Sequence, residues 1–305
     1  MTKKHSIKTY DTESYRDKYI RSGQKVDSML KSDFGKFFMV KVEEMILLMK
    51  LPVPPARTTN HTIIYLTEGE AVMNIGSETY KIFKDECLIV PAGQVFSFRN
   101  IDINKGYLCS FHDDFVVGKF GKSDLLKDFE FLRIWGNPEI RLNEPTSGFV
   151  NNLFKRILEE YATNGIQNQD IIQSYMLALL CEINHVYKPI SNIPYSAASI
   201  LTNRFKELIS SNIRTKHRVT DYALLLNVSP NHLNKSVKAI TGKSSSKWID
   251  ETIVLESKVL LHQSNLTINE IAIEVGHYDQ SYFSRLFKKY EGVTPQEFRK
   301  MIEKS

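Results

Sequence analysis

The last hundred residues of the chain contain one sequence pattern twice. The first copy starts at Val219 as VTDYALLLNVSPNHLNKSVKAITG, and the second starts at Ile268 as INEIAIEVGHYDQSYFSRLFKKYEG. Ala223 in the first copy aligns with Ala272 in the second. Each copy predicts a short apolar helix, a tight turn and a second helix with a polar, basic outer face, which is the layout of a helix-turn-helix. Two such motifs in tandem point to sequence-specific DNA binding.

The second helix of each copy is expected to bury one face. Apolar residues recur there at helical spacing: Leu233, Val237 and Ile240 in the first copy, and Phe283, Leu286, Phe287 and Tyr290 in the second. Ser229 and Asp279 are suited to cap the starts of these helices, because their side chains accept bonds from free backbone N–H groups. Pro230 fits the first helical position.

The opposite, polar face of each second helix supplies candidate DNA contacts. Side chains near the helix start reach base edges, and later ones reach the backbone. The predicted base contacts are Asn231, His232, Lys235, Gln280, Ser281 and Arg285. The predicted phosphate contacts are Lys238, Lys288 and Lys289, with Ser244 and Thr294 at the starts of following helices. Ser229, Asn234, Tyr282 and Ser284 complete the predicted surface. Solvated surface is the alternative interpretation of any one such face, and repetition in a common frame favours DNA.

Residues 247–264 predict one helix that joins the two motifs. Its eighteen residues span about 27 Å at roughly 1.5 Å per residue. Two major-groove entries on one face of DNA lie about 34 Å apart. We therefore expect each protomer to read a bipartite site, and a dimer to read two.

The charge distribution agrees with this assignment. The whole net charge of +5 lies in residues 201–305, while residues 1–200 are balanced. A basic excess on the half that carries the repeat is what phosphate binding requires. With 305 residues and 42% hydrophobic content, the chain is long enough for two globular domains.

The first two thirds of the chain have a different pattern. Residues 1–35 are polar and predict a flexible arm or a loosely packed helix. From about 37 to 115, short strands alternate with turn signals at Glu68-Gly69, Gly76-Ser77, Lys84-Asp85 and 91–93, which favours a small antiparallel barrel or sandwich. Two amphipathic helices follow, over about 149–187. We expect a domain over 1–187, a Pro- and Ser-containing linker over 188–199, and an all-helical domain over 200–305.

Several of these segments resemble a known family. INEIAIEVGHYDQSYFSRLFKKYEGVTPQEFRK and LNVSPNHLNKSVKAITGKS, together covering about 205–300, resemble the two helix-turn-helix motifs of AraC/XylS transcription regulators. IIYLTEGEAVMNI and DECLIVPAGQVFSF are similar to the cupin-like sensor domain of the arabinose-regulator type. One departure is Gly276-His277, where the family usually has Gly-Phe. The resemblance implies a cupin-like β-barrel with a helical hairpin, followed by an all-α DNA-binding domain.

The resemblance also implies partners beyond double-stranded DNA: a small-molecule effector in the barrel, a second copy of the chain, and RNA polymerase if the protein is an activator. The candidate effector contacts are Arg57, Phe96, Phe98, Arg99, Tyr107 and Phe111. The candidate dimer contacts are Ile172, Tyr175, Met176, Leu179, Leu180 and Ile183, an apolar stripe at helical spacing. The alternatives are that the aromatic residues are ordinary core, that the two arginines are solvated, and that the stripe packs against the barrel and the preceding helix. A further alternative is a constitutive regulator whose barrel serves only dimerisation.

A metal-dependent cupin enzyme is the rival from another class. Such a site needs three or four converging His or Glu ligands, whereas His61 and His112 are isolated in the sequence. We therefore expect no enzyme activity, no metal and no cofactor. The three cysteines, Cys87, Cys109 and Cys181, are interpreted as reduced core residues. Without a signal-like or membrane-length apolar stretch, the chain is expected to be cytoplasmic.

Overall fold

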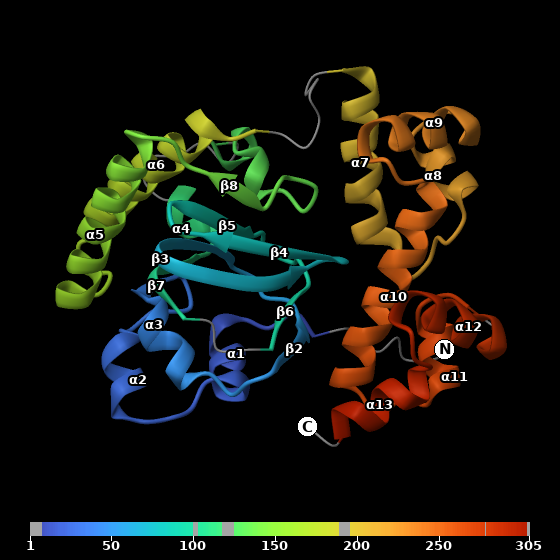
Figure 1. Ribbon diagram of the computed structural model, residues 1–305, viewed down its shortest axis with the longest axis horizontal. Coiled ribbons are helices and arrows are strands. Elements are labelled where there is room, and N and C mark those ends of the chain that lie inside the picture. Colours follow the sequence, from blue (N-terminus) through green and yellow to red (C-terminus); the bar gives the residue numbers. More distant parts are fainter. Residues whose placement is uncertain (1–7, 100–102, 118–124, 189–195, 278, 304–305) are drawn as a thin grey trace. The chain divides into compact units, whose positions relative to one another are not determined.

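The computed structural model describes residues 8–99, 103–117, 125–188, 196–277 and 279–303. These residues form two compact units, one within residues 9–189 and one within residues 190–305 that also includes Lys8. The first unit combines β-strands with helices, and the second is entirely helical (Figure 1). Most of the predicted linker, residues 189–195, lies outside the described residues.

The strands of the first unit are antiparallel and share one long strand. In chain order they are β1 (Phe37–Lys41), β2 (Val53–Ala56), β3 (His61–Ile75), β4 (Glu78–Phe83), β5 (Glu86–Val90), β6 (Phe96–Phe98), β7 (Asn104–Phe111) and β8 (Glu139–Arg141). One path of pairing runs β1-β7-β3-β5-β8, while the far half of β3 pairs with β4 and β6. Because β3 belongs to both groups of strands, it connects the two groups and determines their relative position.

Gly69 explains how β3 continues across both groups. Its φ is +80°, and a Cβ at this position would overlap the carbonyl of Ile103. The pairing of β3 with β7 shifts register between Leu66 and Glu68, so an irregularity bends the strand here. The predicted turn at Glu68-Gly69 is therefore wrong, since a glycine inside a strand signals a bulge as readily as a turn.

The residues before β1, predicted to be loose, are packed. They form helix α1 (Thr12–Tyr19), capped by Asp11, and helix α2 (Gln24–Met29). Tyr19 and Val26 of these helices, with the adjoining Tyr10 and Leu30, are buried in the same core as the strands. Short helices α3 (Val42–Met45) and α4 (Asp113–Val117) and 3-10 turns η1 (Ile46–Leu48), η2 (Leu125–Asp128) and η3 (Glu130–Leu132) connect the other elements.

Helices α5 (Thr146–Asn164) and α6 (Gln169–Val186) contribute their apolar faces to the core of the first unit. The Phe154 ring of α5 stacks against Tyr65 at 5.4 Å and against Tyr107 at 5.3 Å between centroids. On α6, Met176 Sδ lies 3.6 Å from Cys109 Sγ of β7.

The core also buries Cys87, whereas Cys181 is exposed, contrary to the prediction that all three cysteines are core residues.

The predicted dimer stripe on α6 is an internal surface. Five of its residues are 0% exposed, namely Ile172, Met176, Leu179, Leu180 and Ile183. Tyr175 is half-buried, with the Arg156 guanidinium 5.4 Å from its ring. The assignment of this stripe to a dimer interface is wrong, because the stripe is already buried within its own unit. The sequence pattern could not reveal this, since an amphipathic helix buries its apolar face against its own sheet as readily as against a partner.

The second unit contains seven described helices: α7 (Ala197–Asn212), α8 (Val219–Leu225), α9 (Pro230–Thr241), α10 (Ser245–Gln263), α11 (Ile268–Glu274), α12 (Gln280–Glu291) and α13 (Pro295–Glu303). The pairs α8–α9 and α11–α12 correspond to the two copies of the repeat. Helix α10 packs on helices of both copies and joins them. None of the described helices combines the length and apolarity needed to span a bilayer.

Replacing Met176 by Glu should unfold the first unit. The substitution loses buried apolar contacts, which typically costs about 2–5 kcal/mol, and it places a carboxylate where nothing compensates its charge. Ile171→Glu is the matched control, since Ile171 lies on the same helix and is 38% exposed. Circular dichroism melting should show a large decrease in melting temperature for Met176→Glu and a small decrease for Ile171→Glu. If the Met176→Glu protein melts at the same temperature as the unsubstituted protein but has half its mass in light scattering, the dimer assignment would be restored.

Candidate nucleic-acid interface and cavity

Helices α9 and α12 begin and end alike. The Ser229 hydroxyl accepts a bond from the His232 N–H at 3.2 Å, and the Asp279 carboxylate accepts from Ser281 and Tyr282 at 2.8 and 3.1 Å. Those bonds hold the pKa of Asp279 below its ordinary value. Each helix has twelve residues and ends at a glycine with left-handed backbone. The predicted caps are therefore confirmed, and the two helices have the same length.

Each helix buries the predicted apolar face and exposes most of the predicted polar face. Leu233, Val237, Phe283 and Phe287 are 0% exposed. The candidate DNA contacts classed as exposed are Ser229, Asn231, His232, Lys235, Lys238, Gln280, Ser281, Tyr282, Arg285, Lys288 and Lys289. Cationic and amide side chains thus occupy one side of both helices, where they are accessible to a polyanion.

Four candidates are less accessible. Asn234 and Ser284 are half-buried, and the Asn234 Oδ1 accepts the Ser245 N–H at 3.0 Å, so this amide joins α9 to α10. Ser244 and Thr294, also half-buried, are the residues that precede α10 and α13.

The starts of α10 and α13 differ in charge. At Thr294, the Glu297 carboxylate accepts from both the backbone N–H and the hydroxyl, at 2.7 and 2.8 Å, and the N–H bond lowers the pKa of Glu297. An anion already occupies this helix start, which disfavours a phosphate there. The first turn of α10 holds no acidic residue, so the start that follows Ser244 suits a phosphate better.

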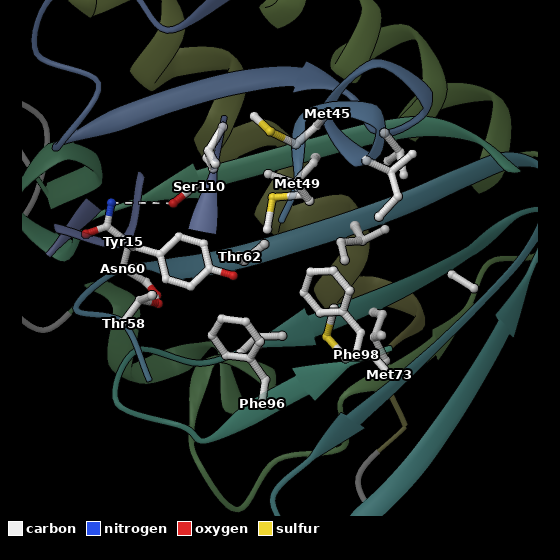
Figure 2. Close-up of a pocket in the computed structure, with 18 of the residues that line it drawn as sticks. Tyr15, Met45, Met49, Thr58, Asn60, Thr62, Met73, Phe96, Phe98 and Ser110 are labelled. Atoms are coloured by element: carbon white, nitrogen blue, oxygen red, sulfur yellow. Dashed lines mark hydrogen bonds between the residues drawn. The ribbon is translucent and has the colours of Figure 1, made fainter. Parts of the chain in front are cut away.

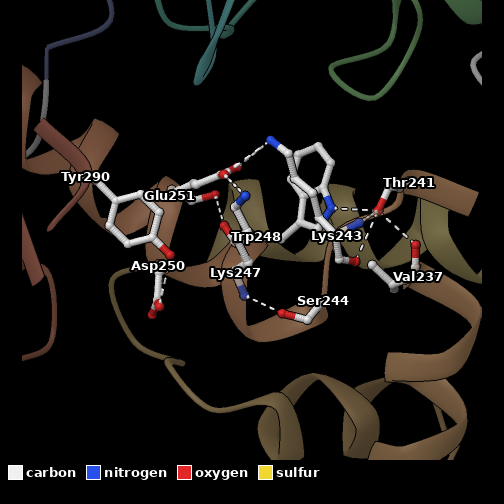
Figure 3. Close-up of polar contacts among 10 residues, drawn as sticks. Val237, Thr241, Lys243, Ser244, Lys247, Trp248, Asp250, Glu251 and Tyr290 are labelled. Carbon is white, nitrogen blue, oxygen red and sulfur yellow. Dashed lines mark hydrogen bonds and ion pairs between the residues drawn. The ribbon is translucent and has the colours of Figure 1, made fainter. Parts of the chain in front are cut away.

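A network at the start of α10 joins it to the end of α9 (Figure 3). The Trp248 indole N–H donates to the Thr241 hydroxyl at 3.0 Å. The Lys243 ammonium lies 5.3 Å from the Trp248 ring and pairs with Glu251 at 2.9 Å, while Lys206 of α7 lies 4.6 Å from the same ring. These contacts join α7, α9 and α10 around one indole.

A second set of contacts joins α10 to α12. The Tyr290 hydroxyl donates to Asp250 at 3.2 Å (Figure 3), and Lys258 pairs with Glu291 at 3.0 Å. Partial burial raises the pKa of Asp250, and burial together with Asp250 raises the pKa of Tyr290 to about 12. Sequence patterns do not reveal these pairs, because the two members of each pair are separated by 40 and 33 residues and no local pattern links them.

His277, where the family usually has Phe, packs near a second histidine. The His217 and His277 rings lie 6.0 Å apart, and His217 occupies the space that a Cβ on Gly276 would need. The Nε2 atoms of both rings are buried without a hydrogen-bond partner in the described part of the chain. Burial lowers the pKa of both histidines. Arg214 pairs with Glu274 beside them, so the segment before α8 is attached to the end of α11.

The first unit holds a cavity of about 140 Å³ (Figure 2). Its wall includes Tyr15 of α1, the side chains around α3, and the faces of several strands, among them Phe96 and Phe98. Globular interiors rarely leave voids larger than a water molecule, and roughly 10–15 Å³ of such space holds one water. This cavity therefore has room for a small molecule.

Two of the six predicted effector contacts line this cavity. Phe96 and Phe98 do, whereas Arg57, Arg99, Tyr107 and Phe111 do not. On β7 the lining residues are Leu108 and Ser110, and alternation turns Tyr107 and Phe111 to the opposite face. Tyr107 there stacks on Phe154 of α5, and Phe111 stacks on His61 at 5.3 Å. The assignment of Tyr107 and Phe111 to the cavity is therefore wrong.

Comparison with known proteins decides the family. A helix-turn-helix domain model matches residues 222–301. The arabinose operon regulatory protein of Salmonella typhimurium is 32% identical over 244 residues, which cover 78% of this chain and 83% of that protein. The chain belongs to the AraC/XylS family of transcriptional regulators.

Other AraC-type relatives align over similar lengths. The Msm operon regulatory protein of Streptococcus mutans is 25% identical over 82% of this chain and 87% of its own length. The regulator YisR of Bacillus subtilis is 26% identical over 79% and 83%. Among solved structures, ToxT from Vibrio cholerae is 14% identical and matches 88% of this chain and 94% of that chain, with a TM-score of 0.42. The protein is a DNA-binding transcriptional regulator and not an enzyme, as predicted.

The histidine pair should make the stability of this regulator's helical unit depend on pH. The ordinary histidine pKa is 6.5, and both folded-state values are lower. As the pH falls below about 6.5, the unfolded chain binds protons before the folded one does, so the free energy of unfolding decreases. The loss ends below the lowered folded-state pKa values. Asp221 acts on His217 from the start of α8, and the Tyr282 ring lies 5.2 Å from the His277 ring. His277→Phe should flatten the decrease, because it removes one of the two histidines.

Urea unfolding checks this expectation. The chain has two tryptophans, so a Trp135→Phe background leaves Trp248 as the fluorescent reporter of the helical unit. The control is His232→Phe, which alters an exposed histidine of α9 and should keep the original pH dependence. An unchanged pH dependence in His277→Phe would contradict the assignment.

Proposed function

We propose that this regulator reads a bipartite DNA site with α9 and α12, and that a small molecule in the cavity modulates the binding. The observation that carries the first part is the pair of twelve-residue helices with matching caps and exposed polar faces. Helix α10 between them has 19 residues and spans about 28 Å. This length is close to the roughly 34 Å that separates successive major-groove entries on one face of DNA.

Selection of bound fragments from a random DNA pool by the full-length protein tests the proposal. We expect two conserved blocks about 10 base pairs apart, because both helices read bases. A single conserved block would mean that only one helix reads sequence, and it would contradict the bipartite site. Repeating the selection with a library of small metabolites identifies effectors by the change in recovered DNA.

Substitutions on the two helices should separate base contacts from phosphate contacts. Lys235→Ala and Arg285→Ala should each cost about 1–3 kcal/mol at the selected site and relax one base position. Lys288→Ala, on the same helix as Arg285, should weaken binding to all sequences equally and reduce its salt dependence. Fluorescence anisotropy titrations on the selected site and on single-base variants measure both effects. Uniform weakening by Arg285→Ala would make Arg285 a phosphate contact.

The second part of the proposal rests on the cavity. A constitutive regulator that uses its barrel only as a scaffold is the alternative, and a fully packed interior would favour it. The void of about 140 Å³ among apolar side chains favours an effector instead. We further propose a cytoplasmic homodimer that contacts RNA polymerase if it activates transcription. The dimer surface then lies elsewhere than the buried stripe of α6.

A further inference from the structure

The wall of the cavity is apolar and rich in sulfur and rings. Met45, Met49 and Met73 line it together with Phe96 and Phe98 (Figure 2). Thioethers and aromatic edges interact favourably with aromatic rings, and flexible methionines adapt to the shape of a guest. The lining therefore suits a compact ring system.

The only cation among the lining residues is already neutralised. Arg16 of α1 lines the cavity, but its Nη2 lies 2.5 Å from the Asp27 carboxylate of α2. The Arg16 guanidinium also lies 5.3 Å from the centre of the Phe34 ring. The pair of Arg16 and Asp27 has no net charge, so a carboxylate in the cavity would meet no unpaired cation. An anion buried among methionine and phenylalanine side chains loses hydration without compensation.

Two hydrogen-bonding groups on the cavity wall have no partner in the described part of the chain. The Tyr15 ring extends from α1 into the cavity (Figure 2), and its hydroxyl makes no hydrogen bond within the described part of the chain. Burial raises the pKa of Tyr15, so the hydroxyl keeps its proton and can donate. Asn104, also in the lining, has a buried Oδ1 without a partner among the described residues, while its amide donates to Glu70. Buried polar atoms normally find a partner, and a ligand can supply one here.

We propose that the effector is an uncharged, mainly apolar ring compound with a single hydroxyl or carbonyl group, which bonds to Tyr15. This inference rests on the proposed effector function and specifies its ligand class. The cavity holds roughly ten water-sized atoms by the volume that one water needs, which corresponds to one or two fused rings. The neutral group of the ligand accepts from or donates to the Tyr15 hydroxyl, and the rings fill the space between the methionines.

Three probes of equal ring size test the charge preference on the full-length protein. They are 2-naphthol, naphthalene and 2-naphthoate, and calorimetric titration at neutral pH measures their affinities. Phenols are uncharged at neutral pH and carboxylates are ionised. We expect 2-naphthol to bind most tightly and 2-naphthoate at least about tenfold more weakly, because of the desolvation of its charge.

Tyr15→Phe tests the hydrogen bond. It should weaken 2-naphthol by about two- to tenfold, the usual contribution of one neutral hydrogen bond, and leave naphthalene unchanged. Tyr19→Phe is the matched control, because Tyr19 lies on the same helix, is buried, and is not among the lining residues. If both substitutions weaken the binding of 2-naphthol equally, the proposed hydrogen bond between Tyr15 and the ligand would be contradicted.

The outcomes separate the ligand class from the effector function. Tighter binding of 2-naphthoate, lost on Arg16→Gln, would overturn the uncharged class, and so would failure of all three probes to bind. Anisotropy titrations measure the affinity for the selected DNA site with and without the probe, and they test the effector function independently of the ligand class. A probe that binds as expected without changing DNA affinity would support the ligand class and count against the effector function.

Discussion

Helix α10 is the constraint on which the DNA-binding unit depends. It contacts α8 and α9 of the first copy of the repeat, α11 and α12 of the second copy, and the flanking helices α7 and α13. Its first half contributes Ile249 and Ile253 to the core, and its second half contributes Leu260 and Leu261. Because one rigid helix completes both packing arrangements, neither α9 nor α12 can rotate independently without exposing apolar surface. The spacing of the two polar faces therefore follows from the length of α10 and from the packing at its two ends.

The sequence predicted the second unit well because its signals are local and repeated. The caps at Ser229 and Asp279, the apolar backs of α9 and α12, and the connecting helix all follow from residues within a few positions of one another. What it did not predict is how the pieces are joined. Tyr290 with Asp250 and Lys258 with Glu291 depend on the packing of α12 against α10. Asn234 appeared to be a surface amide until its bond to the Ser245 N–H assigned it to the same junction.

The first unit shows where strand and helix patterns stop being informative. Alternation correctly groups Tyr107 with Phe111, but it does not say which face of β7 lies towards the cavity. Tyr107 packs against Phe154 of α5 and Phe111 against His61 of β3, whereas the smaller Leu108 and Ser110 line the open space. Helix α6 presents the same ambiguity, because an apolar stripe on an amphipathic helix does not specify which surface covers it. The polar sequence before β1 hid α1 and α2, which bury only a few apolar residues each.

The cavity has an energetic cost that bears on its role. Side chains that line an unfilled space lose contacts that a close-packed core would make. In a unit that served only as a scaffold, larger side chains at positions such as Ala71 or Ser110 would restore those contacts. The chain instead surrounds the space with adaptable methionines and leaves the hydroxyl of Tyr15 without a partner in the described part of the chain. Under the proposed effector function, a guest that fills the space recovers the lost contacts, so the cost of the space and the binding of a ligand are two aspects of the same packing.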